Sequence, residues 1–440
     1  MSLEDLEEIV MQKKFEEGRL LLEIALSRHP DRDATKVQKC LSCGRILRIQ
    51  KDAQPKTVRS QFGEIEYKRP YGVCDRCGQT GAPMDWALGI GNAKVSVGVT
   101  QKVCHAAVIG RSFGDGAEIL AEHSRLEYSA KHVRTIAEGE GQKLVKERET
   151  AVERFRQLKT PSVVSGPAPM LFVVTCDGGR VQTRAETQDS RWKEDKIGVV
   201  YDAVPQPKPE ADSYDRYEGA RSQTKTYVAT MEPWESFGWM LRVEAEKRGY
   251  LQAKAKLLIA DGAQHNRTLK NDHFPEAEMI LDWPHATEHL SASSKAAFGE
   301  GTQAAREWYE EYRELLWKGK RDEIIRELER LSKKIGFPEK CESDASGRAM
   351  LYRNAYSYFP NNYDAIDYPR FRSKGWPIGS GVAEGAVKQF ALRMKGTEKF
   401  WNVSESGAEE MLALCALYHS EDDRWKCYWK ARAKPYDVPA

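Results

Sequence analysis

The chain has 440 residues, which exceeds the size of one ordinary hydrophobic core and predicts two or three domains. Its 68 Lys and Arg residues are nearly balanced by 66 Asp and Glu residues, so a protein that binds nucleic acid through a globally basic surface is excluded. No run approaches the roughly 20 apolar residues of a membrane helix, and Met1–Val10 is acidic, so we expect a cytoplasmic, nucleoid-associated protein with no membrane partner.

The first segment, residues 1–35, is predicted to contain one long helix. Apolar residues recur at helical spacing from Leu3 to about Ser27, and His29-Pro30-Asp31 ends the pattern. Such an amphipathic helix is a candidate self-association surface. Packing of the helix on its own chain is an equally good interpretation.

Residues 36–90 carry two cysteine pairs, Cys40-Leu-Ser-Cys43 and Cys74-Asp-Arg-Cys77, each followed by Gly. Four thiolates satisfy the tetrahedral coordination of zinc, so a zinc-ribbon-like domain with one structural Zn²⁺ is predicted, and a redox-active pair is the alternative. The gap of about thirty residues between the pairs is longer than the usual fifteen to twenty. A hairpin through Val58–Tyr67 would absorb the extra length.

Residues 91–160 are predicted to form a helical DNA-binding domain. The pattern indicates a helix over Ser112–His123, a turn over Ser124–Tyr128 and a second helix through Gln142 that is capped by Ser129. This is a helix-turn-helix outline, and three residues near the start of its second helix are of the types that contact DNA: Lys131, His132 and Arg134. An ordinary helical hairpin with a solvated charged face is the alternative. The Pro/Gly/Ser-rich stretch Thr160–Pro169 reads as the main domain boundary.

Beyond that boundary, residues 170–440 alternate strand and helix patterns, which predicts an α/β sheet. Strands are expected over Met170–Cys176, Lys196–Tyr201, Thr226–Met231, Leu257–Ala260 and Glu276–Asp282, and helices over Pro233–Arg248, Glu288 to about Ile335, and Gly381 to about Arg424. Two of these strands stop at an Asp-Gly pair, which carries Asp177 in one case and Asp261 in the other. Carboxylates at strand ends could share a Mg²⁺ ion, although Asp-Gly is also a common turn.

Glu384 is the candidate third carboxylate. It lies near the start of a helix that is opened by Gly379-Ser-Gly381, and the same helix carries Lys388, Arg393 and Lys395, whose positive charges could hold DNA phosphates. A capped surface helix is the simpler interpretation of the same residues.

Several short motifs together resemble the DDE transposases of bacterial insertion sequences, most closely the Kra-type (ISKra) family. They run in order between about Met170 and Trp429: Cys176-Asp-Gly-Gly-Arg180, Arg191-Trp-Lys-Glu194, Ile259-Ala-Asp-Gly262, Leu281-Asp-Trp-Pro-His285, Gly379-Ser-Gly-Val-Ala-Glu384, Arg393-Met-Lys395 and Gly407-Ala-Glu409. The cysteine-bearing and helix-turn-helix regions resemble that family's N-terminal DNA-binding part. One departure is the longer link Gly396-Thr-Glu-Lys399 before Phe400-Trp401-Asn402, where substrate contacts are expected to differ.

The resemblance implies a multidomain α+β or α/β protein with a ribonuclease-H-like mixed sheet and a helical insertion at about residues 288–370, before the last catalytic carboxylate. It implies that Asp177, Asp261 and Glu384 bind two Mg²⁺ (or Mn²⁺) ions, which serve DNA strand cleavage and strand transfer. Accessory roles near the site fall to Arg191, Trp192, Glu194, Asp282 and His285. The expected partner is double-stranded DNA, both the terminal repeats of the element and target DNA. Because two ends must be processed, a homodimer or larger assembly is expected on DNA.

Three other functions are compatible with parts of the sequence. His285-Ala-Thr-Glu288-His289 matches the H-x-x-E-H signature of a zinc metalloprotease, but it follows a strand-like segment and Pro284, and no third ligand is apparent. A DNA-binding protein derived from a transposase that has lost catalysis would keep the N-terminal modules. A nuclease or resolvase on the same ribonuclease-H-like core would share the metal chemistry.

Overall fold

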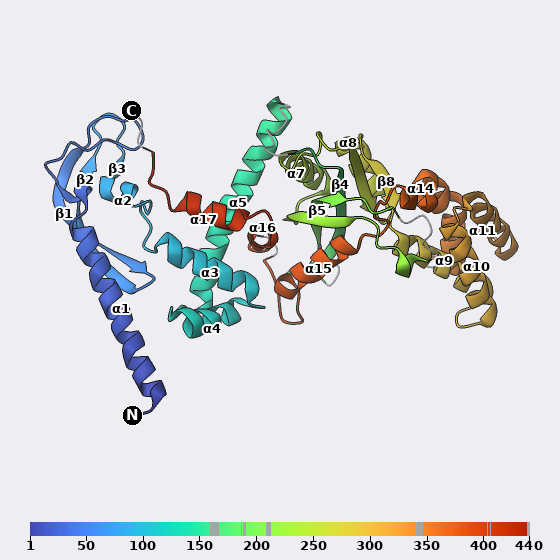
Figure 1. Ribbon diagram of the computed structural model, residues 1–440, viewed down its shortest axis with the longest axis horizontal. Coiled ribbons are helices and arrows are strands. Elements are labelled where there is room, and N and C mark those ends of the chain that lie inside the picture. The colour runs from blue at the N-terminus through green and yellow to red at the C-terminus, as the bar shows by residue number, and fades with distance from the viewer. Residues whose placement is uncertain are drawn as a thin grey trace. The chain divides into compact units, whose positions relative to one another are not determined.

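The computed structural model describes residues 1–158, 167–185, 187, 191–207, 213–339, 343, 346–402, 404 and 406–437 (Figure 1). The chain forms two compact units, Met1–Gly141 with Asp423–Ala440 and Gln142–Asp422. Most of the expected linker Thr160–Pro169 lies outside the described residues, and the division of the chain into four segments stays a prediction. None of the described helices has the length and apolar character required to cross a membrane.

The first unit combines one long helix, a small antiparallel sheet and a group of helices. Helix α1 spans Leu3–Ser27, as predicted, and the Ser2 hydroxyl caps it by accepting from the N–H of Asp5. The sheet has the order β1-β2-β3. The remaining elements are β1 (Arg48–Ser60), β2 (Gly63–Val73), β3 (Thr80–Gly81), α2 (Pro83–Ala87), α3 (Val97–Ile109), α4 (Phe113–Ser124), the start of α5 (Ala130–Leu158) and α17 (Arg424–Arg432).

The β1–β2 hairpin confirms the predicted explanation for the long gap between the cysteine pairs. Its turn falls inside Val58–Tyr67, at Gly63, whose φ of +104° is a conformation that favours glycine. Tyr67 and Ile65 pack with Leu26 of α1 in a small apolar core. The hairpin therefore carries both the second cysteine pair and the packing surface for α1.

The second unit contains a five-stranded mixed sheet with the order β6-β5-β4-β7-β8, which confirms the predicted mixed sheet. Its strands are β4 (Leu171–Gln182), β5 (Trp192–Val204), β6 (Arg221–Thr230), β7 (Ala255–Ala260) and β8 (Glu278–Leu281). β4, β5 and β6 pair antiparallel, whereas β4, β7 and β8 are parallel. The prediction that the first of these strands stops at Cys176 is wrong, because β5 pairs with β4 along its whole length to Gln182.

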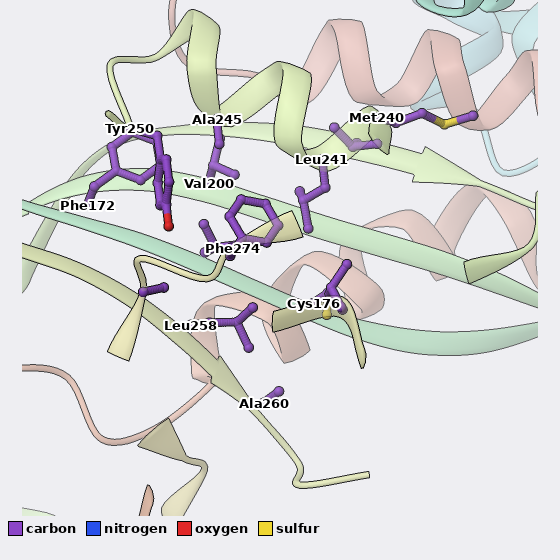
Figure 2. Close-up of a cluster of buried hydrophobic side chains, with 14 of the residues drawn as sticks. Phe172, Cys176, Val200, Met240, Leu241, Ala245, Tyr250, Leu258, Ala260 and Phe274 are labelled. Carbon is purple, nitrogen blue, oxygen red and sulfur yellow. The ribbon is translucent and has the colours of Figure 1, made fainter. Parts of the chain in front are cut away.

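Helices cover both faces of this sheet. On one face, α7 (Trp234–Lys247) and α8 (Gln264–His273) enclose a buried cluster that includes Phe172, Cys176 and Leu258. Figure 2 shows side chains of α7 and of the strands pointing toward one another in this cluster. Successive residues of a strand point to opposite faces, so Asp177 points away from the cluster. The other face packs against α15 (Gly381–Met394) and α16 (Ala408–His419).

A helical region lies between β8 and α15, as the predicted insertion requires. It consists of α9 (Trp283–Phe298), α10 (Gln303–Trp317), α11 (Arg321–Ile335), α12 (Gly347–Arg353), η3 (Asn354–Tyr358), α13 (Phe359–Asn361), η4 (Tyr363–Ile366) and α14 (Tyr368–Ser373). Two contacts close its base, because Asp282 and Trp283 bond to the backbone of the segment that leads into α15. The insertion therefore leaves the sheet and returns to it at one place.

Candidate carboxylate site

Parallel pairing brings Asp177 and Asp261 to the same level of the sheet. Thr175 of β4 pairs with Ile259 of β7, and each aspartate lies two residues beyond its member of this pair. Adjacent strands are about 4.8 Å apart, so the register places the two carboxylates side by side. Both lie on the sheet face that packs against α15, although Asp177 sits within β4 and Asp261 directly follows β7.

Glu384 approaches from the first turn of α15. Its N–H donates to the carbonyl of Ser380 at 3.2 Å, and its carboxylate lies 3.7 Å from the Nζ of Lys388. Burial, together with the charges of Asp261 and Glu384, raises the pKa of Asp177. Three acidic side chains from β4, the end of β7 and α15 are thus close enough to interact electrostatically.

Hydrogen bonds hold the two aspartates in place. Asp177 Oδ1 accepts from the N–H of Gly178 at 2.7 Å. Asp261 Oδ1 accepts from the N–H of Ala263 at 2.9 Å and from the side-chain amide of Asn266 at 2.7 Å. Both of these contacts are made by Oδ1 of Asp261, and neither involves its Oδ2. Carboxylate oxygens are the ligands that Mg²⁺ prefers. The carboxylates of Asp177, Asp261 and Glu384 are therefore suitable in kind as ligands for such an ion. Within the described part of the chain, however, only the four cysteines form a group of three or more residues whose ligand atoms all lie within 4.8 Å of one another, so the three carboxylates interact without converging on one point.

A fully buried carboxylate, Asp282, organises the region behind the site. Its Oδ2 accepts from the N–H of His285 at 3.1 Å and from His285 Nδ1 at 2.6 Å, and its Oδ1 accepts from the N–H of Ser380. The hydrogen bond to Asp282 raises the pKa of His285 to about 9. His285 is therefore a positively charged imidazolium at neutral pH. Its charge opposes part of the rise in the pKa of Asp177. Asp282 also fixes the residue that precedes α15, and thereby the position of Glu384.

Asp195 is a site residue that sequence reasoning missed. It pairs with Gly179 of β4, two residues beyond Asp177 and on the same sheet face, and is only 1% exposed. Among the described residues, neither of its oxygens has a hydrogen-bond partner, and the Nζ of Lys395 lies 4.0 Å away. Burial raises the pKa of Asp195. Two features of the sequence could have indicated this residue. Asp195 directly precedes the apolar pattern of β5, and two glycines follow Asp177.

Gly179 is required by this close packing. A Cβ at that position would lie 2.7 Å from Asp195 Oδ1 and would also collide with the Nζ of Lys395. A Cβ at Gly178 would meet nothing closer than 3.4 Å. The two adjacent glycines therefore have different roles, and only Gly179 makes room for the buried carboxylate.

The predicted DNA-contacting residues occupy different environments. Lys131 and His132 are exposed at the start of α5, where Ser129 caps the helix as predicted by accepting from the N–H of His132 at 3.3 Å. Arg134 is instead paired with Glu138 at 2.8 Å. On α15, the side chain of Lys388 is 79% exposed. Lys131, His132 and Lys388 are thus exposed members of the set, although Lys388 also lies near Glu384.

Arg393 differs from the expectation, because it is only 4% exposed. Its guanidinium lies 5.4 Å from the ring centre of Trp401, whose indole N–H donates to the carbonyl of Met394 at 2.9 Å. The backbone of Trp401 bonds to Gln182 and Arg184, so the longer link before it returns the chain to the end of β4. Arg393 therefore supports this segment from within and does not face solvent as a phosphate contact would.

The remaining accessory residues lie at the start of β5 and its approach. The guanidinium of Arg191 is 5.9 Å from the ring centre of Phe400. The ring of Trp192 is 42% exposed, and Glu194 pairs with the Nζ of Lys196 at 3.2 Å. Trp192 and Phe400 are both exposed aromatic side chains, and Trp192 pairs with Gln182 at the far end of β4 from Leu171.

The geometry of the H-x-x-E-H motif does not favour a zinc protease. His285 is held by Asp282. His289 donates from Nδ1 to the side-chain oxygen of Asn354 at 2.8 Å and stacks on Tyr358 with ring centres 3.6 Å apart. Within the described chain, the two histidines and Glu288 belong to no cluster of three metal ligands. The two histidines instead contact Asp282, Asn354 and Tyr358, and Glu288 is exposed.

The four predicted zinc ligands do come together. The Sγ atoms of Cys40 and Cys77 are 3.6 Å apart, those of Cys43 and Cys74 are 3.5 Å apart, and all four lie within 4.8 Å of one another. Zn–S bonds of about 2.3 Å place tetrahedral sulfurs about 3.8 Å apart, so the cluster could bind a zinc ion.

Two matching turns build this cluster. The N–H of Gly44 donates to Cys40 at 3.0 Å and the N–H of Gly78 to Cys74 at 2.9 Å, and both glycines have positive φ. The N–H groups of the second turn, chiefly that of Cys77, lower the pKa of Cys74 to about 6, which favours the thiolate that zinc requires.

Comparisons with known proteins give matches of limited extent. The sequence model of an uncharacterised protein family (UPF0236) matches residues 1–211. Among solved structures, the Drosophila P element transposase strand transfer complex is similar over 80% of this chain and 85% of that chain, with 10% sequence identity and a TM-score of 0.25. None of the curated proteins matches. The family match covers less than half of the chain and the structural likeness is low, so function is inferred from the carboxylate site itself.

Proposed function

We propose that this protein is a DNA transposase whose second unit is a ribonuclease-H-like catalytic core. The observation that carries the proposal is the placement of Asp177 and Asp261 at one level of adjacent parallel strands, with Glu384 on the helix that packs over them. The sheet order, with three antiparallel strands followed by two parallel ones, supports the same class of core.

In this proposal, Asp177, Asp261 and Glu384 hold two Mg²⁺ or Mn²⁺ ions. Such ions supply activation of the attacking water or 3′-hydroxyl and stabilise the leaving oxygen in an in-line displacement at phosphorus. The chain's own contribution is to fix the three carboxylates. Asp282 does so indirectly, because it holds both His285 and the backbone before α15. The imidazolium of His285 provides a positive charge beside the carboxylates, where a phosphate would approach.

A covalent mechanism through the neighbouring thiol is disfavoured. Cys176 is buried in the apolar cluster on the other face of the sheet, and burial strongly raises its pKa. A neutral thiol that points away from the carboxylates is neither available nor activated as a nucleophile. Direct displacement by water and then by a DNA 3′-hydroxyl is the simpler chemistry.

Affinity for duplex DNA is assigned to phosphate contacts from both units, which would include Lys131, His132 and Lys388. The zinc-ribbon-like hairpin would stabilise the recognition module. Because two element ends are processed, the working form is proposed to be a homodimer or larger assembly on DNA.

The test is metal-dependent cleavage and strand transfer on DNA that carries the flanking ends of the element. Glu384→Gln should abolish both steps and preserve folding and DNA binding, because it removes one carboxylate from the triad. Glu288→Gln is the matched control: Glu288 is an exposed carboxylate on α9 and the base of the rival protease motif, and its loss should leave cleavage intact.

Each outcome has a distinct meaning. Wild-type activity that is lost in Glu384→Gln alone would support the proposal. If wild type and Glu384→Gln bind the ends equally and neither cuts them, the protein is a DNA-binding derivative without catalysis. Equal cleavage by both would remove Glu384 from the mechanism.

A further inference from the structure

Helix α1 carries apolar residues on two opposite faces, and its own chain covers only one of them. The inner face packs on the β1–β2 hairpin through Phe15, Gly18, Leu22 and Leu26. The ring of Phe62 at the hairpin turn lies so close to Gly18 that a Cβ there would be 2.5 Å from it. Figure 1 shows α1 beside the hairpin, with its N-terminal half extending past the strands. The inner face is therefore occupied.

We call the opposite side the outer stripe. It consists of apolar side chains that are each at least 38% exposed: Leu3, Leu6, Ile9, Val10, Leu20, Leu21 and Ile24. At 100° per residue these positions fall in one sector, centred about half a turn from the inner face. The same sector contains two charged residues, Lys13 and Glu17. An apolar stripe of this length is a contact surface for another molecule.

The stripe has the spacing of a coiled-coil seam. The positions 3, 6, 10, 13, 17, 20 and 24 alternate by three and four residues, which is the heptad pattern of two packed helices. Lys13 and Glu17 are the two central positions of this seam. Charged residues at a seam cost stability unless they meet a partner of opposite charge, and they then specify register and orientation.

We propose that the outer stripe is covered by α1 of a second copy of this chain, in an antiparallel pair. In that arrangement Leu6 lies opposite Ile24 of the other copy and Val10 opposite Leu20. The same register places Lys13 opposite Glu17, twice by symmetry, so every apolar seam position between Leu6 and Ile24 meets an apolar one and each charge meets its opposite. Ile9 and Leu21 flank the seam.

Charge excludes the other simple occupants. A parallel pair would place Lys13 against Lys13 and Glu17 against Glu17 inside the seam, which is repulsive at both positions. A membrane surface is also disfavoured, because α1 carries seven acidic and three basic residues and anionic lipids attract basic helices. The antiparallel self-pair satisfies both the apolar and the charged positions. The pairing does not depend on the transposase proposal.

The first experiment measures the assembly of the full-length chain by sedimentation equilibrium without DNA. Wild type should show a concentration-dependent dimer. Lys13→Glu and Glu17→Lys should each weaken it by about tenfold or more, because two attractive pairs become repulsive. The double variant K13E/E17K restores opposite charges across the antiparallel seam and should recover the wild-type dimer. Lys14→Glu is the control, since it makes the same charge change on the neighbouring residue outside the seam.

The second experiment tests orientation by disulfide formation. A mixture of V10C and L20C proteins should form a cross-linked dimer under mild oxidation, whereas either protein alone should form no more than wild type, whose exposed Cys77 and Cys427 set the background. Cross-linking of V10C with itself would overturn the antiparallel pair. A wild-type monomer at all concentrations, or a dimer that folded V10E/L20E protein retains unchanged, would overturn self-association through the outer stripe.

Discussion

Protonation of His419 is expected to loosen the helix pair that supports Glu384. His419 ends α16 and packs against Phe390 of α15, and its Nδ1 accepts from the side-chain amide of Gln389 at 2.9 Å. Burial lowers the pKa of His419 to about 4 from an ordinary value of 6.5. The pKa of His419 is lower in the folded protein than in the unfolded chain, so the unfolded chain binds the proton first as the pH falls. Stability from this group is complete above pH 6.5 and is lost between pH 6.5 and 4.

The size of the effect follows from the two pKa values. At pH 5 they give at most about 2 kcal/mol, or about thirtyfold in the opening equilibrium, and solvent at the partly exposed ring reduces this. Hydrogen exchange of α15 and α16 peptides, measured at pH 7 and pH 5, should show wild type losing protection that His419→Gln retains. Comparing variants at one pH cancels the intrinsic pH dependence of exchange.

His123→Gln is the control, because His123 is exposed on α4, and it should behave as wild type. Equal loss of protection at pH 5 in wild type and His419→Gln would refute the reasoning, since it would show that burial of a neutral imidazole contributes nothing to this helix pair.

Three further predictions concern the carboxylate site and the four-cysteine cluster. Gly179→Ala should lower the free energy of unfolding of the second unit in urea by about 1–3 kcal/mol, because the new Cβ would collide with Asp195. Gly178→Ala is the control and should lower it by less. Equal losses of stability in the two variants would contradict the close packing at Gly179. Asp282→Asn should bring the pKa of His285 from about 9 down toward 6.5, seen by NMR of labelled histidine, and an unchanged titration would exclude Asp282 as the cause. Cys43→Ser should remove one bound zinc per chain and lower the melting temperature of the first unit, whereas Cys427→Ser, outside the cluster, should keep the metal.

Local patterns were sufficient for the elements whose structure depends on neighbours in sequence. The bounds of α1, the cap at Ser129 and the convergence of the cysteine pairs all follow from spacing within short segments. The parallel register that aligns Asp177 with Asp261 was anticipated only as a shared sheet edge.

Features that depend on distant partners were not predictable. The extension of β4 past Cys176 exists because β5 pairs with it, and the polar sequence Asp177–Arg180 gives no strand signal by itself. Asp195 stands before an apolar run and looks like an ordinary strand entry until its pairing with Gly179 is known. Arg393 belongs to a basic helix in sequence, and only the return of Trp401 to β4 encloses it.

The closed base of the helical region fixes the point at which α15 begins. Other residues of the region also bond to the sheet, since the hydroxyls of Tyr358 and Tyr368 donate to the carbonyls of Asp261 and Leu281, each at 3.0 Å. Trp283 donates to the carbonyl of Ile378 at 2.9 Å, and Asp282 accepts from Ser380 beside it, so the chain leaves and re-enters the sheet within hydrogen-bond distance. The free energy of joining two such fixed points grows only slowly with the length of chain between them. The helices that do not include these residues, such as α10 and α11, could therefore be lengthened or replaced, as in an exchangeable cassette, while α15 still delivers Glu384 to the same place.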